Sequence, residues 1–233
     1  YLKATADAIL EQRAGENSKK IIVVSHDAHI HGAQILALNI VKRLKEQFFF
    51  EICILLRSGG SLESKFSKYG QVFNIERDYP SKRSKEILIT NLINEGFTTA
   101  ICNTVVTGDL VDLLVQQNVK TISLIHELPE LIKTSKMEGN AKLISKESYR
   151  IVFPSTYVKD KFEQITKLDQ SRCTIAPQGL YFKNPYKNQI GTARKELRDK
   201  FSLPQDAQIV LAVGFTDYRK GPDIFVKVAK EVI

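Results

Sequence analysis

A strand, a loop and a helix follow one another near the start of the chain, and this pattern constrains the fold more than any other feature. Residues 21–24 (IIVV) form a continuous apolar run, a polar loop with three histidines follows, and Gly32-Ala33 opens a helical pattern of apolar residues. A buried strand joined directly to an amphipathic helix is the opening unit of a parallel α/β sheet. The positive end of such a helix points beyond the strand, where it suits a phosphate.

The same alternation recurs along most of the chain. The sequence therefore predicts the α/β class, with a Rossmann-like, doubly wound parallel sheet. An apolar run at residues 208–213 and a helix from Pro222 predict one more strand–loop–helix unit, which begins a second α/β domain without completing it. The further strands of the first domain are expected at residues 50–56, 71–75, 98–104, 121–125, 150–153 and 173–176.

The pattern also predicts a domain organisation. Because the chain starts without Met and ends inside a strand–loop–helix unit, we expect it to be a segment of a longer protein. Its expected parts are a peripheral N-terminal helix and linker at 1–19, the Rossmann-like domain at 20–180, a linker at 181–192 and the truncated second domain at 193–233.

Composition narrows the class of partner. The formal net charge is +8, from 34 Lys+Arg against 26 Asp+Glu, but the basic residues are scattered and aromatic residues do not alternate with them. A platform for single-stranded nucleic acid needs that alternation, so we expect no nucleic-acid partner. Solvated helix faces account for the charge, or else a surface that meets anionic lipid or a phosphate-bearing substrate. Residues 130–148 are expected to form a polar helical hairpin or lid, and the basic segment 130–150 to form a lid or a membrane-docking edge.

Cysteine and histidine spacing argues against metal or disulfide sites. Cys53, Cys102 and Cys173 stand singly in apolar runs, which favours reduced thiols in a cytoplasmic protein. Only His29 and His31 have ligand spacing, so we expect no metal. Neither GxGxxG nor GxxxxGK[ST] occurs, which disfavours a nicotinamide site and a P-loop, and no cofactor is expected.

Ligands of a doubly wound sheet bind beyond the carboxyl ends of its strands. The polar residues expected at that edge include His26 after the first strand, Asn103 and Thr104 after the fourth, and His126 and Glu127 after the fifth. We expect these residues to line the cleft. Gln178 follows the seventh strand at the same edge. His126 would either contact a substrate hydroxyl or serve as hydrogen-bonded structure.

Two further pairs suit an anion. Gly32 and Ala33 lack bulky side chains, so backbone amides at the helix start would approach a phosphate closely. The alternative is that Gly32 is an ordinary turn glycine with no ligand beside it. Arg219 and Lys220 stand between residues 208–213 and the last predicted helix, where two cations would clamp a diphosphate or belong to an ordinary surface.

Five segments carry a resemblance to a known family, and they are SHDAHIHGAQILALNIVKRL, SLIHELPE, IVFPSTYVKDKF, APQGL and LAVGFTDYRKGPDIFVKVAKEV. In this order and approximate spacing they resemble the family 4 (group 1) glycosyltransferases of the GT-B fold. The resemblance implies two Rossmann-like domains, the first holding the acceptor and the second a nucleotide-sugar donor, and a metal-independent transfer that retains anomeric configuration. The acceptor would be a glycan or a lipid-linked molecule.

The resemblance also implies roles for single residues. Gly32 and Ala33 would lie near the donor diphosphate, Arg219 and Lys220 would grip it, and His126 would be the catalytic residue that faces the transferred sugar. The family's pair of glutamates would lie after the last residue of this chain, so we expect the chain alone to be inactive.

Other functions stay open at this point. One is a sugar-nucleotide epimerase or phosphorylase-like enzyme on the same two-domain plan. Another is a non-catalytic glycan-binding or scaffold module, in which Gly32 and His126 are structural. Contact with an anionic membrane surface is compatible with either transferase or scaffold.

Overall fold

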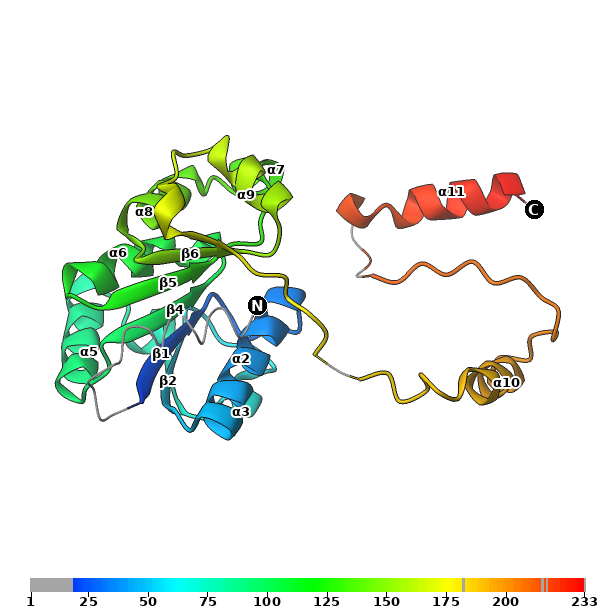
Figure 1. Cartoon of the computed structure of the whole chain (residues 1–233), viewed down its shortest axis with the longest axis horizontal. Helices are drawn as coiled ribbons and strands as arrows, with labels where there is room; N and C mark the ends of the chain where they lie inside the picture. The colour runs from blue at the N-terminus through cyan, green and yellow to red at the C-terminus, as the bar shows by residue number, and fades with distance from the viewer. Residues whose placement is uncertain (1–18, 182, 215, 217, 233) are drawn as a thin grey trace. The chain divides into compact units, whose positions relative to one another are not determined.

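The protein is represented by a computed structural model that describes residues 19–181, 183–214, 216 and 218–232 (Figure 1). Nearly all of the helix and linker predicted at residues 1–19 lies outside these described residues. Two compact units divide the chain between Tyr181 and Phe182, and each is described by itself.

The first unit contains a seven-stranded sheet in which every neighbouring pair of strands is parallel. The spatial order is β3-β2-β1-β4-β5-β6-β7 (Figure 1). This order confirms the predicted doubly wound, Rossmann-like sheet. The strands are β1 (Lys20–Ser25), β2 (Glu51–Leu56), β3 (Gln71–Asn74), β4 (Thr99–Asn103), β5 (Lys120–Leu124), β6 (Arg150–Phe153) and β7 (Cys173–Ile175).

Helices cover both faces of this sheet (Figure 1). Successive side chains of a strand point to opposite faces, so Ile21 and Val23 pack with α2 and α3 while Ile22 and Val24 pack with α5, α6 and α8. Burial on both faces explains why the strands are continuous apolar runs. The helices are α2 (Gly32–Phe48), α3 (Glu63–Phe66), α4 (Ile75–Asp78), α5 (Lys82–Asn94), α6 (Gly108–Gln116), α7 (Pro129–Thr134), α8 (Glu138–Glu147) and α9 (Thr156–Glu163), with 3-10 turns η1 (Val105–Thr107) and η2 (Gln170–Arg172).

The strand order reverses between β1 and β4, and this reversal positions the site. From β1 the chain builds outward to β2 and β3, then returns to place β4 on the other side of β1. Val24 pairs with Cys102, so the loops that follow Ser25 and Asn103 leave the sheet side by side. Ligands of such folds bind at this switch point.

The segment at residues 130–148 forms two helices, α7 and α8, as a helical hairpin. The apolar side chains of Ile132, Ala141 and Ile144 are fully buried in the core that includes α6. Because α8 is part of the helical layer over the sheet, the segment is not a detached lid.

The second unit contains α10 (Ile190–Lys200), η3 (Tyr218–Lys220) and α11 (Pro222–Val232). The helix α10 begins at Ile190, inside the predicted linker. The strand predicted at residues 208–213 is not formed: Val210 and Leu211 are 77% and 76% exposed, and no described residue of this unit pairs with them as a strand. A strand needs the hydrogen bonds of a neighbour, which explains the difference.

Candidate functional site at the switch point

Three predicted residues meet where β1, β4 and β5 end. The Nε2 atom of His126 lies 3.0 Å from Oδ1 of Asn103, and Nδ2 of Asn103 donates to the carbonyl oxygen of Ala33 at 2.8 Å. A carbonyl only accepts hydrogen bonds, which fixes the orientation of the Asn103 amide and turns its Oδ1 toward the histidine. The Nε2 atom of His126 therefore carries the proton.

The other ring nitrogen of His126 accepts a hydrogen bond. Nε2 of Gln178, in the segment after β7, lies 2.8 Å from Nδ1 of His126. The hydroxyl of Tyr181 donates to Oε1 of the same glutamine at 3.4 Å. Burial lowers the pKa of His126 to about 4. At neutral pH the imidazole is thus neutral, and both nitrogens are hydrogen-bonded to protein amides.

This geometry bears on the predicted role of His126. A general base near neutral pH needs a pKa close to that pH and a lone pair directed at the substrate. In this structure the lone pair on Nδ1 is directed at Gln178. The arrangement favours a neutral hydrogen-bonding partner over a residue that exchanges protons.

The carboxyl group of Glu127 turns back toward the backbone. Its Oε2 accepts hydrogen bonds from the amides of His126 at 3.1 Å and Val105 at 3.3 Å. Burial raises the pKa of Glu127, and these amides act in the opposite direction. The side chain therefore ties the loop after β5 to the loop after β4.

His26 belongs to a second polar group at the same edge. Its Nδ1 lies 3.3 Å from Oγ1 of Thr104, and its Nε2 lies 3.1 Å from Oδ2 of Asp27 and 2.8 Å from Nε2 of Gln34. Burial lowers the pKa of His26, while Asp27 opposes that shift. The backbone of Thr104 has φ 79°, which is a strained conformation for a β-branched residue.

Gln34 is a site residue that sequence reasoning missed. Its Nε2 donates to Oδ1 of Asp27 at 2.5 Å, whereas its buried Oε1 has no hydrogen-bond partner among the described residues. The only signal in the sequence was a polar residue on the inward face of the helix that begins at Gly32. Gln178 was predicted at this edge, after the seventh strand, but not as a partner of His126.

The start of α2 is open. No side chain caps this helix, its first turn contains no acidic residue, and a Cβ atom added to Gly32 would meet nothing within 4 Å. The positive end of the helix dipole, beside the Asn103–Ala33 contact, therefore has no carboxylate within its own first turn. This geometry suits an anion at Gly32 and Ala33.

The loop before α2 is held from the side by the loop after β2. A Cβ atom added to Gly60 would lie closer than 3.0 Å to the backbone of Ala28 and His29, and the amide of Leu62 donates to the carbonyl of Ala28 at 2.7 Å. Only glycine permits this approach. The loop that contains His26 thus has a fixed path.

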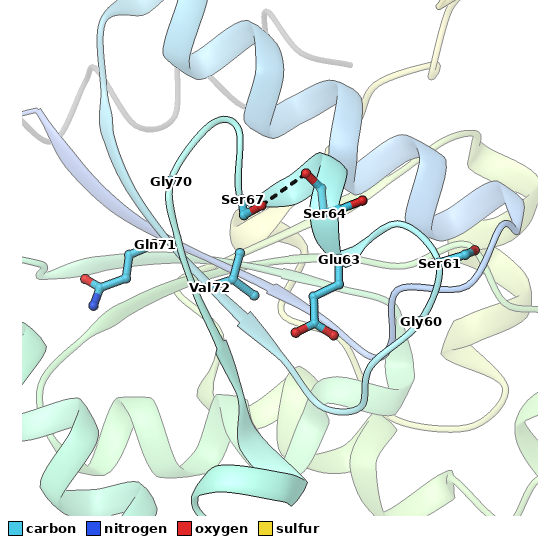
Figure 2. A pocket seen from close by; sticks show the side chains of 8 residues that line it. All are labelled: Gly60, Ser61, Glu63, Ser64, Ser67, Gly70, Gln71 and Val72. Carbon is cyan, nitrogen blue, oxygen red and sulfur yellow. Dashed lines mark hydrogen bonds between the residues drawn. The ribbon is translucent and has the colours of Figure 1, made fainter.

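A hollow of about 720 Å³ lies on the other side of Gly60, between α3 and β3 (Figure 2). The side chains of Glu63 and Val72 face each other across it, while that of Gln71 points away (Figure 2). None of the predicted site residues lines this hollow, and its polar groups do not converge.

Of the two cations predicted to bind a diphosphate, Lys220 is exposed in η3, directly before α11. Arg219 lies in the same turn, and its side chain is outside the described part of the structure. Among the described residues, no group of three or more His, Cys, Asp or Glu side chains is placed to hold a metal ion. Nor does any helix among them have the length and apolar character needed to cross a membrane.

Comparison with known proteins supports the fold. No family model and no curated protein matches the chain. Among solved structures, Anabaena Alr3699/HepE in complex with UDP and glucose is similar with a TM-score of 0.71 and 13% identity, over 91% of this chain and 58% of that one. A glycosyltransferase from Rickettsia africae ESF-5 gives a TM-score of 0.64 and 16% identity, over 93% and 58%.

The HepE structure in complex with UDP alone is also similar, with a TM-score of 0.60 and 13% identity over 78% of this chain and 50% of that chain. This chain therefore spans little more than half the length of these structures. At such identity the likeness establishes the class of the fold: a Rossmann-like α/β protein of the kind found in glycosyltransferases.

Proposed function

We propose that this chain is part of a glycosyltransferase that transfers a sugar from a nucleotide-sugar donor. The observation that carries the proposal is the contact between Asn103 and Ala33, which joins the His126 network to the uncapped start of α2. A diphosphate suits the helix start, and sugar hydroxyls suit the neutral amides and imidazoles next to it. The fold of HepE, which binds UDP and glucose, supports the same function.

The finer assignments belong to this proposal. The enzyme is of the family 4 (group 1) type, acts without a metal or cofactor, retains anomeric configuration and uses a glycan or lipid-linked acceptor. His126 binds a sugar hydroxyl as a neutral imidazole, and His26, Asn103, Thr104 and Glu127 shape the surface around it. Gly32, Ala33, Arg219 and Lys220 bind the donor diphosphate. The protein is cytoplasmic and contacts anionic membrane surfaces through the basic segment 130–150.

The test is turnover of nucleotide-sugars by the protein that contains this chain. We expect UDP-glucose or a related donor to be consumed and a glycoside to form, and His126→Ala to lower the rate by about tenfold or more. His29→Ala is the matched control, because His29 lies exposed in the loop before α2. Failure of every common nucleotide-sugar to bind or react would overturn the proposal.

A non-catalytic glycan-binding module is the second candidate, because both ring nitrogens of His126 are hydrogen-bonded to protein amides. For such a module, glycans bind without any turnover of donor. A sugar-nucleotide epimerase is a third function, and product analysis distinguishes it from a glycosyltransferase. An epimerase yields an altered nucleotide-sugar and no glycoside.

A further inference from the structure

The two amides that hold His126 differ in how firmly they are fixed. Asn103 is fully buried, and its side chain is also bonded to the backbone of Ala33. Gln178 is only partly buried, and it lies in a segment after β7 where the nearby Leu180 is 89% exposed. Displacing Asn103 would break its buried hydrogen bonds to both His126 and Ala33. Displacing Gln178 costs less, because water is available to it as an alternative hydrogen-bond partner.

Gly179 adds to this difference. Its backbone has φ 70°, and a Cβ atom placed there would meet nothing within 4 Å. The residue next to Gln178 therefore occupies a conformation that glycine adopts without strain, in open space. A change of backbone direction at Gly179 meets no packed atom at that position, and it changes the direction in which the preceding Gln178 is held.

We propose that Gln178 is a positioning residue that occupies Nδ1 of His126 in the free protein and yields this atom to a hydroxyl of the bound sugar. The proposal rests on the proposed function. Asn103 keeps the proton on Nε2 throughout, so the lone pair on Nδ1 is what the ligand meets. The exchange replaces one N–H donor by one O–H donor, and no proton is transferred.

This assignment restricts the ligand group. An atom that only accepts hydrogen bonds makes no bond with Nδ1 while Nε2 carries the proton. Phosphate oxygens of the donor are such acceptors and belong at the start of α2. A sugar hydroxyl can donate, so Nδ1 of His126 distinguishes the sugar end of a donor from its diphosphate end.

Long-range ¹H–¹⁵N spectra of the imidazoles provide the test, recorded on the protein that contains this chain, with His126→Gln to identify the signal of His126. In the free protein we expect Nε2 protonated and Nδ1 unprotonated. Gln178→Ala should keep that pattern, because Asn103 remains. Gln178→Glu places a carboxylate at Nδ1, so both nitrogens should be protonated near pH 7. A spectrum unchanged by Gln178→Glu would overturn the proposal.

The ligand half of the test compares UDP with UDP-glucose, with binding measured separately by calorimetry. UDP-glucose should shift the Nδ1 signal of His126 and the side-chain amide signals of Gln178, and UDP should leave both unchanged. Gln178→Glu should weaken UDP-glucose about tenfold more than UDP, because Nδ1 then carries a proton. Gln164→Glu, on the surface at the end of α9, controls for the added charge.

The outcomes separate the two proposals. If neither compound binds, the proposed function fails, and the sugar-exchange role of Gln178 fails with it. If UDP-glucose binds while the signals of Nδ1 and Gln178 stay in place, the nucleotide-sugar function stands and the role of Gln178 is wrong.

Discussion

Nδ2 of Asn103, at the end of β4, donates a hydrogen bond to the carbonyl oxygen of Ala33, in the first turn of α2, at 2.8 Å. These residues are 70 positions apart in the sequence, and their contact joins the two loops at the switch point of the sheet. The same amide orients His126 through its oxygen. One buried side chain therefore sets both the proposed phosphate end and the proposed sugar end of the site.

Asn103→Ala should lower the free energy of unfolding by about 2–4 kcal/mol. The change removes the hydrogen bonds of Asn103 to Ala33 and to His126, and the buried Nε2–H of His126 loses the acceptor that Asn103 provides. Denaturation with urea measures the change. Asn39→Ala is the control, since the Asn39 amide bonds to the carbonyl oxygen of Ile35 in its own helix. A loss in Asn103→Ala no larger than in this control would show that the buried contact contributes little.

Stability should depend on pH through His126. The pKa of about 4 in the folded protein lies below the ordinary value of 6.5, so the unfolded chain binds more protons between these values. The free energy of unfolding should therefore fall as the pH falls from about 6.5 to about 4, by roughly 3 kcal/mol from this group. The difference between wild type and His126→Gln, measured by thermal unfolding across this range, isolates the contribution. Parallel curves for the two proteins would contradict it.

Gly60→Ala should destabilise the first unit by several kcal/mol, on the order of 2–4, because the added methyl group meets the backbone of Ala28 and His29. Gly139→Ala provides the opposite case. A Cβ atom there meets nothing within 4 Å, and the position lies in α8, so this change should stabilise by about 0.5–1 kcal/mol. Chemical denaturation of both variants decides the point, and equal effects would rule out the close approach as the cause.

Gly32→Val tests the helix start as an anion site. The side chain has open space around it, so the free energy of unfolding should change by less than about 1 kcal/mol. Its bulk should nevertheless keep a diphosphate away from the amides and weaken UDP binding about tenfold. Calorimetric titration measures the affinity, and Gly191→Val, also in open space and in α10, is the control. Unchanged UDP affinity in Gly32→Val would remove the helix start from the site.

The strands of the first unit were predictable from the sequence because the five central strands are buried on both faces and are therefore largely apolar. Several boundaries were wrong by a residue. The strand expected at 71–75, for example, ends at Asn74, whose side chain accepts a hydrogen bond from the amide of Arg77 and starts α4. The last residue of a strand is hard to predict from sequence, because a helix cap of this kind competes with the sheet for the backbone of that residue.

The candidate site was only partly predictable. Polar residues directly after strands identified His26, Asn103, Thr104, His126 and Glu127, because the carboxyl ends of parallel strands share one edge. Gln34 and Gln178 were missed as partners of the two histidines. Their contacts depend on how a helix face and a chain segment pass over that edge, and residue spacing does not contain this information.

The backbone conformation of Thr104 is one that glycine adopts more easily than threonine. A β-branched residue with φ 79° costs about 1–3 kcal/mol that glycine would avoid. Glycine would also remove the hydroxyl that stands 3.3 Å from Nδ1 of His26. At this position the chain therefore combines a strained backbone with a hydroxyl placed beside the imidazole of His26.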